Sequence, residues 1–218
     1  MSKGAAKKYV VFFDFDNTIT TFDVLDDMME RFSKDDRWIE LERKWKKGEI
    51  GSRLCLDGQI RGIRITKKKL HTYLKTVKLD PAFKKLVNFL KTKRIKTVIL
   101  SDDFGYILSR VLKNNGITGV RFYCNSLKLA KGKLIPSFPF LNSDCKKCAH
   151  CKKSNLMANI AKGAITVYVG DGLSDVCPSR SADIVFAKGS LERYCRKEDI
   201  SYIPIKSLND VYKFFKNL

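Results

Sequence analysis

Short apolar runs recur along this chain, and between them apolar residues repeat at helical spacing. Runs of this kind, bounded by polar or turn-forming residues, are typical of strands that are buried on both faces. Strands that alternate with amphipathic helices favour a parallel sheet in an α/β fold. The predicted strands are Tyr9–Phe13, Lys96–Leu100, Val120–Cys124, Ile165–Val169, Ile184–Ala187 and Tyr202–Ile205.

Two stretches interrupt this alternation. Residues 22–78 contain no convincing strand, and their apolar residues form three helical stripes, the last of which follows the capping residue Thr66. Residues 126–140 contain two short apolar segments around Ala130–Gly132, which is typical of a β-hairpin. We therefore expect a Rossmann-like parallel sheet core with helices on both faces, formed by residues 1–21 and 79–218. A helical unit, residues 22–78, is inserted after its first strand.

The composition is that of a globular protein with one core of ordinary size. The chain has 218 residues, of which 44% are hydrophobic and 30% are charged. No apolar run is long enough to span a bilayer, and the N-terminal segment lacks the apolar region of a signal peptide. We therefore expect a cytoplasmic protein with no membrane partner, whereas the sequence leaves the oligomeric state open.

The net charge of +20 has two interpretations. A charge of this size attracts anions such as phosphorylated metabolites or nucleic acid. The excess is mostly lysine spread along the chain, which is typical of a lysine-rich surface without a specific partner. Nucleic-acid binding is therefore the weaker interpretation, and it stays an alternative from another functional class.

Polar residues stand where three of the predicted strands end. In open parallel sheets, ligands bind beyond the carboxyl ends of the strands. We therefore expect these carboxylates and hydroxyl groups to lie at one edge of the sheet. The set consists of Asp14, Asp16, Thr18, Ser101, Asp171 and Asp175.

Several carboxylates at one edge repel one another unless a cation binds between them. Their oxygen atoms, in a chain with only two histidines, indicate Mg²⁺ rather than zinc. Beside such a cation Asp14 stays ionised as a nucleophile, and Asp16 can act as a general acid. A phosphate group bound beside this cation would also need hydrogen-bond donors and a fixed positive charge. The candidates for these are Thr18, Ser101, Lys152 and Lys153.

Four segments together resemble the motifs of the haloacid dehalogenase superfamily of phosphohydrolases. They are D-F-D-N-T at 14–18, Ser101, Lys152 and G-D-G-L-S-D at 170–175. The resemblance spans almost the whole chain, and the inserted helices are similar to that superfamily's C1-type cap. Asn17 stands where many members carry glycine, and a short polar residue can adopt the same turn. Lys152 fits the family's lysine position better than Lys153, which stays an alternative.

The resemblance implies a mechanism and a metal site. Asp14 would attack phosphorus to give an aspartyl-phosphate, and Asp16 would serve as the acid and then as the base for water. Mg²⁺ would be held by the Asp14 carboxylate, the Asp16 carbonyl and Asp171, with Asp175 behind a water molecule.

Within the superfamily the chain resembles the phosphoserine-phosphatase-like branch, subfamily IB. Residues 139–153 and 170–205 are most similar to methionine-salvage phosphatases that act on 2-hydroxy-3-keto-5-methylthiopentenyl-1-phosphate. Related phosphoethanolamine and phosphocholine phosphatases share the cysteine-rich approach to the lysine. The substrate class expected from this resemblance is a small phosphorylated metabolite.

Phosphoserine fits less well and is the runner-up substrate. Asp23 matches an acidic position of phosphoserine phosphatases, but Gln59 stands where they place a cap arginine, and a neutral amide does not replace an arginine–carboxylate pair. Arg53, Arg61 or Arg64 would have to compensate. The substrate-binding candidates are Thr18, Asp23, Gln59, Asp102 and Lys153.

Three of the seven cysteines form a C-x-x-C-x-x-C run at Cys145, Cys148 and Cys151, with His150 adjacent. This spacing suits a metal site that takes a fourth ligand from His150 or a distant cysteine. An iron–sulfur run would need a further cysteine at Asn155. Reduced thiols in a loop are the alternative, and both interpretations stay open.

Overall fold

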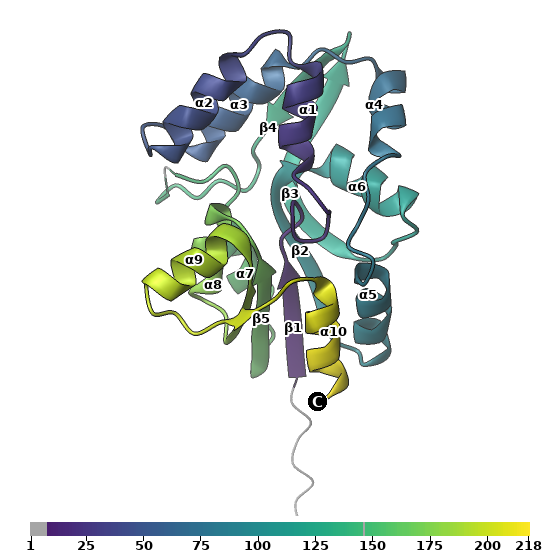
Figure 1. The fold of residues 1–218 in the computed structure, drawn as a ribbon, viewed down its shortest axis with the longest axis vertical. Helices are drawn as coiled ribbons and strands as arrows, with labels where there is room; N and C mark the ends of the chain where they lie inside the picture. The colour runs from purple at the N-terminus through teal and green to yellow at the C-terminus, as the bar shows by residue number, and fades with distance from the viewer. Residues whose placement is uncertain (1–7, 146) are drawn as a thin grey trace, which may run out of the picture.

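The computed structural model describes residues 8–145 and 147–218 and contains a seven-stranded sheet in the order β4-β3-β2-β1-β5-β6-β7. All neighbouring strands are parallel except β3 and β4, which are antiparallel. This architecture, shown in Figure 1, confirms the predicted α/β fold class. The strands are β1 Lys8–Phe13, β2 Lys96–Phe104, β3 Arg121–Ala130, β4 Lys133–Ser137, β5 Ala164–Gly170, β6 Ile184–Ala187 and β7 Ile203–Pro204.

Strand β1 lies at the centre of the sheet because its side chains are apolar on both faces. Val11 and Phe13 belong to the larger buried cluster, whereas Val10 and Phe12 belong to a second cluster on the opposite face. Since successive side chains of a strand point to opposite faces, this continuous apolar run needs cover on both sides.

Helices supply that cover on each face of the sheet. Helices α5 (Phe83–Thr92), α6 (Gly105–Asn114) and α10 (Leu208–Lys216) contribute apolar residues to the larger cluster. On the other face, α7 (Lys152–Met157) packs Leu156 under β1. The remaining helical elements after α7 are the 3₁₀ turn η1 (Leu173–Asp175), α8 (Val176–Ser179) and α9 (Gly189–Lys197).

Residues 22–78 contain four helices, and Figure 1 shows them above the end of the sheet where β1 finishes. They are α1 (Val24–Phe32), α2 (Arg37–Lys46), α3 (Ser52–Gly62) and α4 (Lys67–Leu74). Thr66 caps α4 as expected, accepting a hydrogen bond from Lys69 N. Helix α3 was not among the three predicted stripes. The division into a core and a separate cap stays a prediction.

The predicted hairpin is present, but its first strand is longer than expected. Strand β3 leaves the parallel sheet and continues to Ala130, where it pairs with β4. Ile65 N donates to Gly132 O at 3.2 Å, so the hairpin tip contacts the segment between α3 and α4.

Strand β2 also extends beyond its predicted end, from Leu100 to Phe104, across a register shift against β3. Ser101–Asp103 therefore lie in the strand. In the described part of the chain, no helix is both long and apolar enough to cross a membrane.

Candidate active site

Three strands deliver polar residues to one edge of the sheet. Asp14 directly follows β1, and its backbone N donates to Val169 O of β5 at 2.9 Å. Asp171 directly follows β5, and Ser101 lies near the end of β2. Because β1 pairs in parallel with both β2 and β5, their carboxyl ends lie side by side.

Asp14, Asp171 and Asp175 form a carboxylate cluster, in which one oxygen of each lies within 4.8 Å of the others. Thr18 Oγ1 donates to Asp171 Oδ1 at 2.9 Å. Burial and the charge of Asp175 raise the pKa of Asp171 to about 6 and raise the pKa of Asp14 well above its usual range. A nearby cation would keep these groups ionised. The oxygen-only donor set fits Mg²⁺, which Asp14 and Asp171 would hold.

Lys152, the first residue of α7, provides the positive charge at this cluster. Its buried Nζ donates to Asp14 Oδ1 at 2.6 Å, to Asp175 Oδ1 at 2.7 Å and to Ser174 Oγ at 2.9 Å. Although burial disfavours its charged form, the charges of Asp14 and Asp175 raise the pKa of Lys152 well above its usual range. Lys153 is exposed and does not line the pocket, so the structure places Lys152 at the cluster.

Asp16 is directed toward the start of α1, where its Oδ1 accepts a hydrogen bond from Val24 N at 2.9 Å. Burial, together with the charges of Asp23 and Asp103, raises the pKa of Asp16 well above its usual range. A carboxyl group that keeps its proton is suited to act as a general acid. Asn17 has a φ of 53°, a left-handed conformation that a short polar residue tolerates.

Ser101 is completely buried, and its Oγ accepts from Asp103 N at 2.9 Å. It does not line the pocket, whereas Asp102 and Asp103 do. Burial raises the pKa of Asp102 to about 6. Asp103, which the sequence analysis did not single out, lies in the extension of β2.

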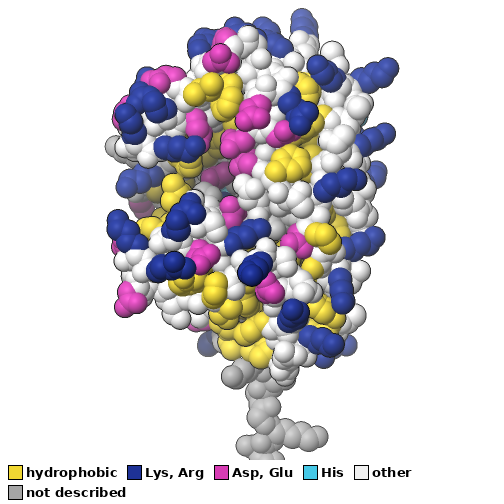
Figure 2. Space-filling model, in the orientation of Figure 1, with side chains coloured by type: hydrophobic (Ala, Val, Ile, Leu, Met, Phe, Trp, Pro, Cys, Tyr) yellow, Lys and Arg dark blue, Asp and Glu magenta, His cyan; other side chains and the backbone are white. Residues whose placement is uncertain are grey.

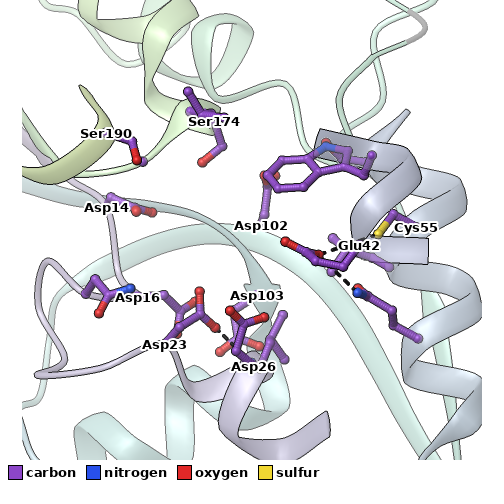
Figure 3. A pocket seen from close by; sticks show the side chains of 18 of the residues that line it. Asp14, Asp16, Asp23, Asp26, Glu42, Cys55, Asp102, Asp103, Ser174 and Ser190 are labelled. Carbon is purple, nitrogen blue, oxygen red and sulfur yellow. Dashed lines mark hydrogen bonds between the residues drawn. The ribbon is translucent and has the colours of Figure 1, made fainter. Parts of the chain in front are cut away.

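A cavity of about 270 Å³ lies between this sheet edge and helices α1–α3. Leu25, Met29, Trp45, Cys55 and Leu56 form its apolar wall. Its polar wall is acidic, as the close-up in Figure 3 shows. The carboxylates are Asp14, Asp16, Asp23, Asp26, Glu42, Asp102, Asp103 and Asp171, and the lysines are Lys46 and Lys152.

Glu42 of α2 is a pocket residue that the sequence did not single out. Its Oε2 accepts from Nε2 of the buried Gln59 at 3.1 Å. Figure 3 shows Glu42 among the side chains that line the pocket. Asp23 caps α1, accepting from Asp26 N at 2.9 Å. Partial desolvation and the charges of Asp23 and Glu42 raise the pKa of Asp26 to about 7. Glu42 and Trp45 are three positions apart, which places them on one helix face.

The arginines considered as partners for a substrate carboxylate lie elsewhere. Arg53, Arg61 and Arg64 do not line this cavity. Arg61 pairs with Asp57 at 2.8 Å, and Arg64 donates to Arg61 O. No described residue therefore supplies a guanidinium group to the pocket.

The three-cysteine run is not assembled as a metal centre among the described residues, where the aspartate cluster is the only group of three suitable ligands. Cys145 Sγ and Cys148 Sγ are 3.5 Å apart, but Cys151 Sγ contacts Ser154 Oγ at 3.0 Å instead. His150 Nε2 contacts Asn155 Nδ2 at 2.8 Å.

Comparison with protein families decides the enzyme class. Residues 9–194 match the family described as "Putative Phosphatase". The chain belongs to this family. The predicted superfamily and the predicted class, a phosphoric monoester hydrolase, are thereby confirmed.

Bacterial relatives of this family member cover nearly the whole chain. A protein of Bacillus mycoides named 2-hydroxy-3-keto-5-methylthiopentenyl-1-phosphate phosphatase is 25% identical over 215 residues, which is 95% of this chain and 96% of that protein. A protein of the same name from Geobacillus thermodenitrificans is 26% identical, with 97% of each chain covered.

Solved structures of phosphatases share the fold of this family member. A substrate-bound phosphoserine phosphatase has a TM-score of 0.72 at 17% identity and covers 95% of this chain and 98% of its own. A HAD family hydrolase from Salmonella enterica serovar Typhi has a TM-score of 0.71 at 18% identity. The match covers 90% of this chain and 67% of that hydrolase. At these identities the likeness concerns the fold.

Proposed function

We propose that this phosphatase hydrolyses a small phosphate monoester in two steps through a phosphorylated Asp14, with Mg²⁺ as cofactor. The observation that carries this proposal is the buried contact between Lys152 Nζ and Asp14 Oδ1 at 2.6 Å, beside Asp171 and beneath the cavity. Bound Mg²⁺, held by the Asp14 and Asp171 carboxylates and the Asp16 carbonyl, would neutralise negative charge that develops on the phosphoryl oxygens.

In the first step, an Asp14 carboxylate oxygen forms a bond to phosphorus as the bond to the substrate's ester oxygen breaks. Asp16, whose raised pKa lets it keep a proton, donates that proton to the departing oxygen. The products of this step are the alcohol and phosphorylated Asp14. Lys152 holds the phosphoryl group in place because its ammonium is fixed between Asp14 and Asp175.

In the second step, the Asp16 carboxylate takes a proton from a water molecule, whose oxygen attacks phosphorus. The bond between phosphorus and Asp14 breaks, and inorganic phosphate leaves. Asp14 is then an ionised carboxylate and Asp16 again carries a proton, so the cycle is complete.

The leading substrate is the methionine-salvage keto-phosphate, 2-hydroxy-3-keto-5-methylthiopentenyl-1-phosphate. Relatives that match almost the whole chain bear its name. The cavity also has an apolar wall that can contact an uncharged thioether chain.

The acidic wall favours a second candidate, a phosphate monoester whose organic part carries an ammonium group, such as phosphoethanolamine or phosphocholine. Asp23, Asp26 and Glu42 lie on the side of the inserted helices, and Trp45 offers an aromatic face to a cation. The same carboxylates repel the carboxylate of phosphoserine, for which no described arginine is present in the pocket.

A substrate panel tests both candidates. Phosphate release with Mg²⁺ is measured for p-nitrophenyl phosphate, phosphoserine, phosphoethanolamine, phosphocholine and the keto-phosphate, with Asp14→Asn as the inactive control. Glu42→Gln should lower kcat/KM at least about tenfold for the ammonium substrates and leave p-nitrophenyl phosphate within twofold. Preference for the keto-phosphate, unaffected by Glu42→Gln, would reject the ammonium candidate. Activity that survives Asp14→Asn would reject the mechanism.

The alternative of nucleic-acid binding has no comparable support. Figure 2 shows lysine and arginine side chains scattered over the visible face, with acidic side chains gathered at its recessed centre. A nucleic-acid site is normally a continuous basic patch or groove.

A further inference from the structure

Tyr168 is a completely buried residue of β5 that carries a polar group into the core. Its ring packs in the same apolar cluster as Phe12 and Leu156, where phenylalanine would fill the same space apart from the hydroxyl group. A buried hydroxyl group needs a hydrogen-bond partner. The Tyr168 hydroxyl donates to Asp175 Oδ1 at 2.6 Å.

Asp175 is held from every side by groups of the chain. Its Oδ1 accepts from Tyr168 and from Lys152 Nζ at 2.7 Å, and its Oδ2 accepts from Asp171 N and Gly172 N, both at 3.0 Å. A carboxylate has about four acceptor positions, so these donors use all of them. The Asp175 side chain is therefore fixed in position.

The position of Asp175 determines where the Lys152 ammonium lies. Lys152 Nζ bridges Asp175 Oδ1 and Asp14 Oδ1, at 2.7 and 2.6 Å. If Asp175 lost its bond from Tyr168, only Lys152 would donate to Oδ1. The carboxylate could then turn about its side-chain bond and draw the ammonium away from Asp14.

We propose that Tyr168 is a positioning residue of the phosphatase: its hydroxyl group fixes Asp175, which in turn holds Lys152 against Asp14. This inference rests on the proposed function, because the task of Lys152 is to hold the phosphoryl group on Asp14. Tyr168 itself does not line the cavity.

The test compares Tyr168→Phe with Tyr123→Phe. Tyr123 is the control, because this half-buried tyrosine packs against the same cluster and its hydroxyl donates to Asn159 Oδ1, away from the site. Three quantities are measured for each protein. They are kcat with p-nitrophenyl phosphate, the calorimetric affinity for Mg²⁺, and the affinity for beryllofluoride, which mimics the phosphoryl group on an aspartate.

We expect Tyr168→Phe to lower kcat and the beryllofluoride affinity about tenfold, since a hydrogen bond to a charged group is removed. The Mg²⁺ affinity should match that of Tyr123→Phe. In an Asp175→Asn background, Tyr168→Phe should cause no further loss of beryllofluoride affinity, because both changes act on one contact.

Three results would overturn the proposal. The first is a beryllofluoride affinity and kcat within twofold of the wild type, and the second is an equal loss in Tyr123→Phe. The third is a Mg²⁺ affinity that falls by the same factor, which would place the effect at the metal. If the wild type itself neither turns over substrate nor binds beryllofluoride, the proposed function fails and the assignment of Tyr168 fails with it. An active wild type with an unaffected Tyr168→Phe variant rejects the assignment alone.

Discussion

His150 should make the folded protein sensitive to acid. Its side chain is 1% exposed and lies beside Phe140, with ring centroids 5.4 Å apart. Nδ2 of Asn155 can only donate, so His150 Nε2 accepts this bond and the imidazole is neutral. Burial, and then the nearby charge of Lys152, lower the pKa of His150 to about 3.

The sign and size of the effect follow from this pKa. Below about pH 6.5 the histidine of the unfolded chain takes up a proton, whereas His150 in the folded protein does not until about pH 3. The unfolded state therefore binds more protons in this window, and the free energy of unfolding falls as the pH falls. Between pH 7 and pH 5 the loss due to this one group is about 2 kcal/mol.

Urea unfolding at pH 7 and pH 5 measures this loss. His150→Gln removes the titrating group and retains an acceptor for Asn155, so this variant should lose about 2 kcal/mol less than the wild type between the two pH values. The chain's other histidine, His71, lies near the surface against Tyr106, and His71→Gln should behave almost like the wild type. Equal losses in His150→Gln and the wild type would show that His150 is protonated in the folded protein and would refute the reasoning.

Three further predictions concern the site. Asp14→Asn should lower phosphate release at least about a thousandfold, and retained turnover would contradict this. The melting temperature should not fall, because the substitution removes one negative charge from the carboxylate cluster. Gly170→Ala should cost about 1–3 kcal/mol of unfolding free energy in urea, since a Cβ would lie 2.5 Å from Asp175 Oδ2, and an unchanged midpoint would contradict it. Mg²⁺ should raise the melting temperature more at about pH 7.5 than at about pH 5, because the metal-free pKa of Asp171 is about 6 and its proton must leave on binding; an equal rise at both pH values would argue against this site.

The sheet edge with its carboxylates could be predicted from the sequence because it depends on local patterns. The run Tyr9–Phe13 is apolar at every position, which favours a central strand covered on both faces. Any polar residue just after such a strand must lie at the carboxyl edge, as Asp14 does beside Val169. The same reasoning applies to Asp171 after β5.

Other features depend on contacts between distant segments. Strand β2 continues through Asp102 and Asp103 because Phe104 pairs with Asn125 of β3 beyond a register shift. Acidic residues have low strand propensity, so the local sequence favours an earlier end. Helix α3 contains Gly58, which weakens the helical signal, yet a Cβ at this position would lie 2.7 Å from Leu41 Cδ1. The glycine is therefore explained by the close approach of α2.

The acidic pocket could not be predicted from the local sequence for a similar reason. Trp45 belongs to an apolar stripe, and a stripe at helical spacing predicts a core-facing side. Only the packing of α2 and α3 shows that Trp45 and Glu42 line a cavity, with Gln59 holding the carboxylate in place. The amide of Gln59 thus orients an acidic residue, Glu42, toward the cavity.

The charge of the whole chain and the charge of its pocket have opposite signs, and the two act over different distances. The net charge of +20 acts on an approaching phosphate dianion from outside, in a field screened over about 8 Å at physiological salt. Inside the cavity, Lys152 contacts Asp14 and Asp175, and the other carboxylates that line the cavity favour a second positive charge. A metal ion at Asp14 and Asp171 would neutralise part of this negative charge. Asp23, Asp26 and Glu42 line the cavity from residues 22–78, so under the proposed function the organic part of the substrate meets this acidic wall.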